Sequence, residues 1–483
     1  MKALLFIIGF FLSFTSFTKP KKPNVIYILT DQWRSSSLGY TGNNVVKTPF
    51  VDQFSKESVN FKNAVSVLPV CTPHRAALLT GRYPTTTGMI VNDLYLPSEE
   101  VCMAEIFKEN NYNTAYLGKW HLDGHGRKKN VIPQRRQGFE FWQGSECDHD
   151  YNNEHYYEND DPVIKYWQGY SPYAISDAAN KYLESRQHVD KPFLLLVSLG
   201  TPHFPHDNAP KDIVAKYPKE SLKLDPNVPD SIKNKVLTEL QGYYAHCTAT
   251  DIAIGKIIQK LKDLRLYDNS IIVFTSDHGA MMGAHGYRPY MKQQFYAESA
   301  EVPFLISYPG INKNKGKVSQ APITTPDILP TLLSMCNIKI AKTIEGYDLS
   351  NLVRKPNKGH DRAALYMNPC PFNIAWDDKE YRAIKTSKYT YVRTVEGPAF
   401  LFDNTSDPYQ LNNLINTYNY AKVQAKLDKT LLSEMHRIGD KEVYPRDYYL
   451  TNFGFKGLKE FNQTYSVKNF NDVKNVITPN QKK

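Results

Sequence analysis

The chain has 483 residues, a formal net charge of +10 and a pI near 8.9, and this length suits one large domain and a smaller one. The positive charge suits an acidic partner, but the sequence contains no recognisable nucleic-acid-binding motif, so we expect no nucleic-acid partner. The cysteines are scattered, define no disulfide framework and include no C-x2-C pair, which argues against zinc. They are Cys71, Cys102, Cys147, Cys247, Cys336 and Cys370.

The first residues, MKALLFIIGFFLSFTSFTKP, have the features of an export leader. A lysine precedes an apolar run over residues 3–14, which fits a signal-peptide core and is shorter than the ~20 residues of a membrane span. We therefore predict a signal peptide over residues 1–18 and a mature protein that is periplasmic or secreted. No cysteine follows the run, so we expect no membrane anchor. The alternative, a buried N-terminal strand, is disfavoured by the many phenylalanines beside the free terminus.

Four apolar runs each end abruptly in polar, chemically capable residues. They cover residues 24–30, 113–118, 192–200 and 270–276. Such continuous runs are typical of parallel strands covered on both faces, and ligands of open α/β sheets bind beyond the carboxyl ends of the strands. We therefore expect the polar residues that follow the runs to share one site. They are Asp31, Gln32, Lys119, His121, His203, Asp277 and His278, whereas Trp120, between Lys119 and His121, is expected to pack in the core.

Helical segments alternate with these strands. Residues 174–186 and 233–266 have apolar residues at helical spacing. This alternation predicts an α/β fold with a large mixed, mostly parallel sheet between layers of helices. We predict that the catalytic domain covers residues 19–355.

After about residue 355 the pattern changes. Residues 380–394 and 399–414 are typical of short alternating strands, and a polar helix follows them. We predict a C-terminal α+β subdomain over residues 356–483 with a four-stranded antiparallel sheet. A polar insertion over residues 147–170 is rich in tyrosine, and these rings could stack on sugars or cover the edge of the sheet.

The segment PVCTPHRAALLTGR, residues 69–82, places a cysteine at a predicted helix start. Pro73 suits the first turn of a helix, which puts Cys71 at the positive end of the helix and Arg75 one turn further on. Such an environment favours anions. Spacing alone leaves Cys71 as a thiol nucleophile, a disulfide partner or the precursor of another group.

The same segment matches the C-x-P-x-R…TGR signature, and the chain resembles the type I sulfatases. Further matches are IYILTDQWR, GKWHL, TPHFPH, SDHGAMMGAHG, MKQQFYAESAEVPFLISYPG and LFDNTSDPYQLNNL, in the order that this family uses. The resemblance covers nearly the whole mature chain. It implies an alkaline-phosphatase-like fold and the hydrolysis of sulfate esters.

The resemblance also implies the cofactors. A maturation enzyme would oxidise Cys71 to formylglycine, whose hydrate has one hydroxyl that attacks sulfur and a second that expels sulfate. One calcium ion would supply positive charge beside the developing anion. Its ligands would be the Cys71-derived diol with Asp31, Gln32, Asp277 and His278. The last aspartate, Asp277, could also take the proton from the attacking hydroxyl.

The remaining roles follow from the same resemblance. Arg75 would hold the diol and the carboxylates, and His121 would act on the diol during sulfate release. Lys119 and Lys292 would clamp the sulfate oxygens. His203 would protonate the leaving alcohol, with Lys292 sharing that role. Substrate-binding residues are therefore expected to be Lys119, His203, Lys292 and His125.

Two positions depart from the pattern that is common in the family. Gln32 stands where a second aspartate often follows the first strand, and it offers an uncharged oxygen ligand. His278 stands where asparagine often follows the last aspartate. Because imidazole is a poor partner for calcium, His278 could contact sulfate instead of the metal.

Several residues also have ordinary structural explanations. Without the motif around it, Cys71 would be interpreted as a buried structural thiol. Asp31 and Asp277 would be interpreted as helix caps or turn residues. His125, His206 and His285 are more often solvated or outside the reacting centre, and they are kept as candidates for the substrate pocket. The basic loop over residues 126–139 could bind an anionic chain or form a solvated surface; its cations include Lys128, Lys129, Arg135 and Arg136.

We therefore expect an exported sulfatase that acts on a sulfated carbohydrate. Export, positive charge and aromatic loops agree with a polysaccharide such as ulvan or carrageenan, or its oligosaccharides. One alternative is a phosphonate or phosphate diester hydrolase of the same fold. The other is an inactive carbohydrate-binding homologue, which should have lost Cys71, Lys119 or Asp277, and none of them is lost.

Overall fold

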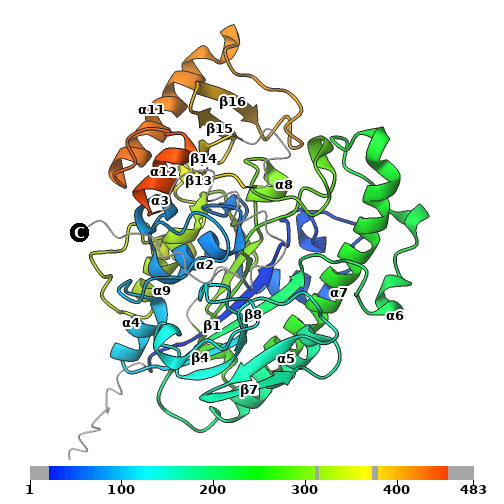
Figure 1. Cartoon of the computed structure of the whole chain (residues 1–483), viewed down its shortest axis with the longest axis vertical. Helices are drawn as coiled ribbons and strands as arrows, with labels where there is room; N and C mark the ends of the chain where they lie inside the picture. The colour runs from blue at the N-terminus through cyan, green and yellow to red at the C-terminus, as the bar shows by residue number, and fades with distance from the viewer. Residues whose placement is uncertain (1–20, 311–314, 373–378, 455–483) are drawn as a thin grey trace, which may run out of the picture.

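A mixed sheet forms the centre of the computed structural model, which describes residues 21–310, 315–372 and 379–454. The predicted signal peptide and the last part of the predicted C-terminal subdomain lie outside the described residues. The sheet has ten strands (Figure 1). Their spatial order is β11 (Lys317–Ser319), β2 (Val59–Phe61), β10 (Phe304–Ser307), β9 (Ser270–Ser276), β1 (Asn24–Asp31), β8 (Phe193–Pro202), β4 (Asn113–Lys119), β5 (Phe141–Ser145), β6 (His155–Glu158) and β7 (Asp161–Tyr166).

The middle of the sheet is parallel, as the apolar runs predict. β9, β1, β8, β4 and β5 pair in parallel, whereas β10, β6 and β7 pair antiparallel to their neighbours. Every residue of β1 is buried, because helices cover both faces. The predicted α/β fold with a mostly parallel sheet is confirmed.

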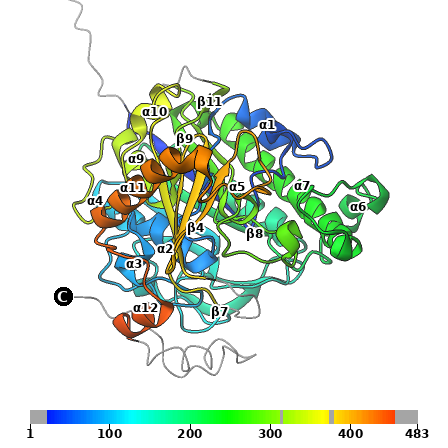
Figure 2. The same cartoon turned by 90° about the horizontal axis from the view of Figure 1, so that it is seen from above.

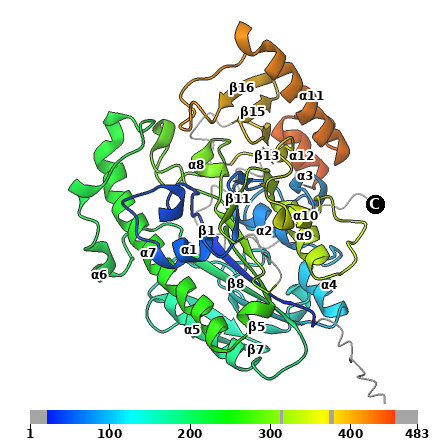
Figure 3. The same ribbon diagram turned by 180° about the vertical axis from the view of Figure 1, so that it is seen from behind.

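Alternate residues of β1 enter two separate cores. Val25 and Tyr27 face one core, and Ile26 and Ile28 face the other. The helices on the first face include α2 (Cys71–Thr80), α4 (Met103–Glu109), α9 (Ile328–Met335) and α10 (Ser350–Arg354). Those on the second face, seen from behind in Figure 3, include α1 (Pro49–Ser55), α5 (Ser171–Glu184) and α7 (Lys233–Asp263).

A second sheet, from the C-terminal part of the chain, supports the start of α2. Its antiparallel strands are β13 (Ala364–Asn368), β14 (Tyr381–Lys385), β15 (Tyr389–Thr394) and β16 (Gly397–Asp403). α11 (Ala421–Arg437) packs on this sheet (Figure 2). Side chains of the sheet and α11 share a core with Val67, Leu68 and Val70. The C-terminal sheet therefore holds in place the segment that leads into Cys71.

Short elements complete the described structure. They are β3 (Ala64–Val65), β12 (Ile323–Thr324), α3 (Pro84–Thr87), α6 (Lys211–Val214), α8 (Ala297–Ala300) and α12 (Arg446–Asn452). Among the described residues, no helix combines the length and the apolar character needed to cross a membrane. All six cysteines are buried, and each has a free thiol that takes part in no disulfide in this structure.

Candidate active site

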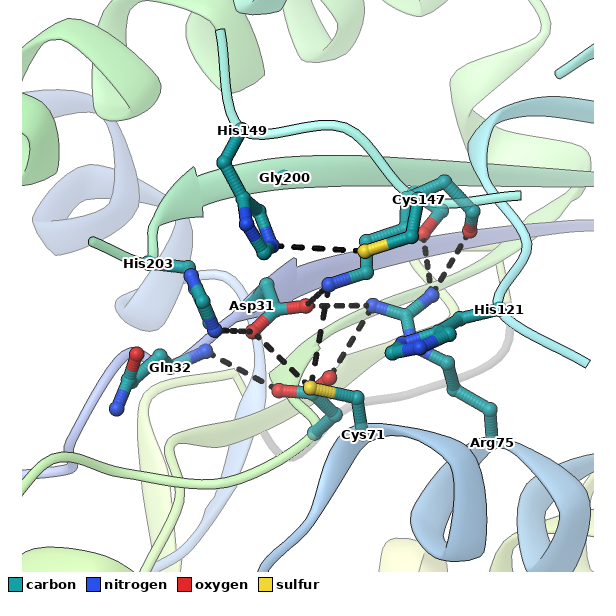
Figure 4. A network of polar contacts seen from close by, with 12 residues as sticks. Asp31, Gln32, Cys71, Arg75, His121, Cys147, His149, Gly200 and His203 are labelled. Atoms are coloured by element: carbon teal, nitrogen blue, oxygen red, sulfur yellow. Dashed lines mark hydrogen bonds and ion pairs between the residues drawn. The ribbon is translucent and has the colours of Figure 1, made fainter. Parts of the chain in front are cut away.

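The expected polar residues meet where the central strands end. Asp31 ends β1, Lys119 ends β4, His203 follows β8 and Asp277 follows β9. Figure 4 shows Asp31 and His203 beside Cys71 at the start of α2. The register between β1 and β8 shifts between Thr30 and Asp31, a local irregularity of the kind that redirects side chains beside active sites.

Cys71 is the first residue of α2 and is 1% exposed. Its Sγ lies 3.0 Å from Nζ of Lys292 and 3.2 Å from Nε2 of His278. Nζ of Lys119 is 3.9 Å away. Burial alone would raise the pKa of the Cys71 thiol, but Lys119, Lys292 and His278 lower it well below its ordinary value. The surroundings of Cys71 therefore favour a negatively charged group.

Arg75, one turn further along α2, joins the two buried carboxylates. Its Nη2 lies 3.2 Å from Oδ2 of Asp31 and 3.1 Å from Oδ2 of Asp277. Its Nη1 donates to the carbonyl of Lys119 and to Oγ of Ser198, both at 2.8 Å. All of these side chains are almost completely buried. The guanidinium therefore neutralises and positions carboxylates that water cannot reach.

The two carboxylates differ in electrostatic environment. Burial and Cys71 would raise the pKa of Asp31, but Lys119, at 2.7 Å, together with His203 and Arg75 lowers it below its ordinary value. Burial and the charge of Asp31 raise the pKa of Asp277. Asp31 is thus the carboxylate that its neighbours keep ionised, and Asp277 is the one that binds a proton more readily.

Asp31, Cys71, Asp277 and His278 form a group that could hold a metal ion. Their ligand atoms all lie within 4.8 Å of one another. Oε1 of the adjacent Gln32 is buried and has no hydrogen-bond partner in the described part of the chain, whereas its Nε2 donates to the carbonyl of Tyr290. Carboxylate and amide oxygens are ligands that a hard cation prefers. This set of ligands therefore suits a divalent cation, whose charge would offset the repulsion between the two carboxylates.

The hydrogen bond of His278 fixes which of its nitrogens faces this group. Its Nδ1 lies 2.9 Å from the carbonyl of Gly279, so Nδ1 carries the proton and donates. Nε2 then presents a lone pair 3.5 Å from Oδ1 of Asp277 and 3.2 Å from Nζ of Lys292. His278 can therefore accept from Lys292 or ligate a metal.

Close packing of two strands positions Lys119. Gly118, just before it, has a φ of +95°, and a Cβ there would lie 2.0 Å from the carbonyl oxygen of Ser198 in β8. Only glycine permits this approach. The approach brings the end of β4 beside β8 and places the ammonium of Lys119 against Asp31.

His121 is held by residues that the sequence analysis did not single out. Its Nε2 lies 3.0 Å from Oδ1 of Asp93, and Asp93 also accepts two hydrogen bonds from Arg127, both at 2.8 Å. Burial lowers the pKa of His121, but Cys147 and Asp93 outweigh it and raise the pKa to about 9. No motif marks Asp93, which lies 28 residues before its partner.

The comparisons with known proteins identify the family. The sulfatase family model matches residues 23–338, and the model of the C-terminal part of N-sulphoglucosamine sulphohydrolase matches residues 283–437. The chain belongs to the sulfatase family. It is therefore a sulfuric ester hydrolase, and the resemblance stated from the sequence motifs is confirmed.

Relatives of this sulfatase support the assignment over most of its length. It is 56% identical over 437 residues to an ulvan-active sulfatase of Formosa agariphila, covering 90% of this chain and 85% of the relative. It is 30% identical over 455 residues to an endo-4-O-sulfatase of Bacteroides thetaiotaomicron, covering 81% and 88%. The solved structure of yidJ from Bacteroides fragilis matches with a TM-score of 0.80 at 30% identity, covering 89% and 98%.

A second pair of residues that the sequence analysis missed lies beside the cluster of this sulfatase. Sγ of Cys147 is 3.5 Å from Nε2 of His149. The ring of His149 stacks on that of His203, with centroids 4.4 Å apart and planes 18° from parallel (Figure 4). A stack of two histidines was not detectable in advance, because 54 residues separate them in the sequence.

The remaining histidines and the basic loop have other surroundings. His125 is half-buried and contacts Asp123 and Tyr95, so its expected role in substrate binding stays a prediction. Nδ1 of His206 lies 2.7 Å from Glu239, and His285 stacks on Tyr296. In the basic loop, Arg135 pairs with Asp123, Arg136 is buried against Trp142, and Lys128 and Lys129 are exposed.

Proposed function

We propose that this sulfatase is exported and removes sulfate from a polysaccharide of the ulvan type, using a formylglycine made from Cys71 and one calcium ion. The convergence of two lysines and a metal-type group on one buried cysteine carries the proposal. Lys119 and Lys292 supply positive charge beside Cys71, and Asp31, Asp277 and His278 supply ligands.

The thiol of Cys71 stands where the reacting oxygen of a formylglycine hydrate would lie. That hydrate would supply a nucleophilic hydroxyl and a second hydroxyl that allows sulfate to leave. Full burial of α2 means that a maturation enzyme must reach Cys71 before the chain folds. A thiol in this position, beside two ammonium groups, would otherwise remain a stable anion without an easy release step.

Asp31, Gln32, Asp277 and His278 would hold calcium with the Cys71-derived oxygen. The orphaned Oε1 of Gln32 and the two carboxylates fit a hard cation. When bound, calcium would supply fixed positive charge beside the sulfate group. The imidazole of His278 is the least typical member of this set, and it would serve equally as an acceptor for Lys292.

The chain's own cations would bind the sulfate oxygens. Nζ of Lys119 is anchored on Asp31 at 2.7 Å, and Nζ of Lys292 lies among Cys71, His203 and His278. Fixed cations in a buried site stabilise negative charge without reorganising, so they contribute more than they would in water. His121, oriented by Asp93, would donate to the nucleophile side of the site.

His203 would deliver the proton to the leaving alcohol. Its Nδ1 lies 2.7 Å from the carbonyl of Phe204 and therefore carries the proton that is used in that bond. Nε2 is left to accept from Lys292 at 3.3 Å. The proton for the alcohol would thus pass from Lys292 to Nε2 of His203. Asp277, whose pKa is raised, would take the proton from the attacking hydroxyl.

The substrate class rests on relatives and on charge. The 56% identical relative is named as ulvan-active, and the +10 charge suits a polyanion. We propose cleavage of a leader over residues 1–18, a catalytic domain over 19–355 and a C-terminal subdomain over 356–483. Export would place the enzyme in the periplasm or outside the cell, where it encounters its polysaccharide substrate.

A panel of defined substrates tests the proposal. Sulfate release would be measured on ulvan and carrageenan oligosaccharides, alongside a paired aryl sulfate and aryl phosphate diester. We expect release from ulvan oligosaccharides and a strong preference for the aryl sulfate. A preference for the phosphate diester would overturn the proposed reaction. Sulfate release from carrageenan alone would overturn the proposed substrate.

A further inference from the structure

A groove lies on the flank of the molecule between α5 and the edge strands β5, β6 and β7. Figures 1 and 3 place α5 and β7 together at the same end of the molecule. The groove has a volume of about 510 Å³. Much of its lining comes from the tyrosine-rich insertion, so the insertion both extends the sheet edge and forms a surface hollow.

Aromatic rings line both sides of this flank groove. On the insertion side, Tyr156 stacks on Trp167, with centroids 3.9 Å apart and planes 15° from parallel. On the α5 side, Tyr182 lies against Phe141 at 5.0 Å. Tyr166 stands at the rim with 45% of its surface exposed. Rings presented in this way offer apolar faces with polar edges, a combination that suits the faces of sugars.

Polar atoms in the lining lack partners. Nε1 of Trp167, the hydroxyl of Tyr182 and Oε1 of Gln143 have no hydrogen-bond partner among the described residues. Buried polar groups are normally paired. A ligand rich in hydroxyl groups could satisfy these atoms after small rotations of the side chains, whereas an aliphatic ligand without polar groups could not.

The α5 side of the groove carries cations. Lys181 lines it and is exposed, and the guanidinium of Arg186 lies over the ring of Tyr182 at 5.4 Å. The acidic residue of the lining, Asp177, pairs with Lys256 at 3.2 Å, and Glu158, which accepts from Gln143 of the lining, pairs with Lys165. Lys181 and Arg186 therefore favour an anionic ligand on this side.

The flank groove is separate from the active site. Phe141 pairs with Ala115 at the start of β5, whereas Ser145 pairs with Lys119 at the end of β5. Four residues along a strand correspond to about 13 Å. A small sulfate ester in the active site would therefore not reach the groove, but a long chain could occupy both.

We propose that the flank groove binds a stretch of sulfated polysaccharide outside the active site. The inference rests on the proposed function, because it needs a polymeric substrate. Holding the chain at a second place raises its effective concentration at the active site. The groove should therefore lower the KM for polymer and leave the turnover of small sulfate esters unchanged.

Native gel electrophoresis in gels containing soluble ulvan tests binding without turnover. The parent would be the full-length Cys71→Ala protein, which releases no sulfate. Adding Tyr156→Ala and Tyr166→Ala should weaken retardation by about threefold to tenfold, the loss expected for ring contacts. Tyr418→Ala is the matched control, since that tyrosine is 96% exposed and lies before α11, far from the groove in sequence.

Kinetics of the active enzyme give the second readout. The Tyr156→Ala/Tyr166→Ala variant should raise the KM for ulvan while kcat/KM on nitrophenyl sulfate stays at the wild-type value. Unchanged retardation and KM would overturn the inference, and so would failure of the parent to bind ulvan. A dimer that the substitutions dissociate would also overturn it, by making the groove an interface between copies.

These outcomes are distinguishable from failure of the proposed function. If wild-type enzyme releases sulfate from ulvan and the groove variants bind ulvan normally, only the groove inference fails. If wild-type enzyme hydrolyses nitrophenyl sulfate but no sulfated polysaccharide, the proposed substrate fails, and the groove inference fails with it.

Discussion

Nζ of Lys292 donates to Nε2 of His203, and the two atoms lie 3.3 Å apart. The other nitrogen of His203 is committed to the carbonyl of Phe204. Burial also lowers the pKa of His203 well below its ordinary value, so the unliganded imidazole is neutral. The pair therefore places a proton donor directly at Nε2, the nitrogen that would protonate the leaving group.

His203→Ala should slow the hydrolysis of a sulfated sugar far more than that of an aryl sulfate. A sugar alkoxide needs protonation as it leaves, whereas a phenolate does not. We expect a loss of about 10²–10⁴-fold on the oligosaccharide and a small loss on nitrophenyl sulfate. His436→Ala, on the exposed side of α11, is the control. Equal losses on both substrates would show that His203 binds sulfate or supports the fold instead.

Cys71 should carry an aldehyde in active enzyme. A hydrazide probe should label wild-type protein and Cys147→Ala, which lacks the second buried thiol of the site, and should fail to label Cys71→Ala. Cys71→Ala should also have no measurable turnover and a wild-type melting temperature. Intact-mass measurement gives an independent readout, and fully active protein with an unmodified thiol would contradict the proposal.

Removal of the proposed calcium ion should lower stability and activity together. Without a cation, the neighbouring carboxylates Asp31 and Asp277 repel each other in a buried site. Calcium at a hundredfold excess over its Kd should stabilise the protein by about 2.7 kcal/mol, measured by urea unfolding with and without a chelator. Gln32→Ala should weaken this response. A chelated protein with unchanged stability and activity would show that the metal site is assigned wrongly.

Arg75→Ala should destabilise the fold strongly. It leaves two buried carboxylates without their shared cation, and breaking a buried ion pair in this way costs about 3–5 kcal/mol. The matched control is Lys388→Ala, which removes an ion pair with Asp403 from a lysine that is 51% exposed. Its effect should stay below about 1 kcal/mol. Comparable unfolding free energies for the two variants would refute the bridging role of Arg75.

Stability should fall as pH rises because of Glu154. This glutamate is completely buried, and burial raises its pKa from 4.5 to about 8. Between these values the unfolded chain releases the proton and the folded chain keeps it, so stability decreases by about 1.4 kcal/mol per pH unit. Below 4.5 both states are protonated, and above 8 no further loss occurs.

Glu154→Gln should remove this slope. Urea unfolding at pH 5 and pH 8 should show that the free energy of unfolding of the variant rises relative to that of wild type as pH increases. The exposed Glu220→Gln variant should show the same pH dependence as wild type. A constant difference between Glu154→Gln and wild type across this range would mean that Glu154 is ionised in the folded protein.

The sequence predicts those parts of the structure that leave a pattern in a short, continuous stretch of residues. β1, β4, β8 and β9 are continuous apolar runs because both faces of the sheet are covered, so their carboxyl ends could be located in advance. Asp93 and His149 could not, because their importance comes from contacts with His121 and His203 that only the fold creates. Sequence did not separate the two roles of the insertion; it forms the edge strands β6 and β7 of the central sheet, and sugar binding there stays a proposal.

All ten residues of α2 are buried, and Cys71 is the first of them. Under the proposed mechanism, oxidation of that cysteine would compete with folding, and a molecule that folds first would be closed to the maturation enzyme. Such a molecule would have the native structure and a normal melting curve, yet it would stay inactive for its whole lifetime. The specific activity of a preparation would then depend on which of the two processes came first during synthesis, and slower folding in the producing cell would yield a more active enzyme.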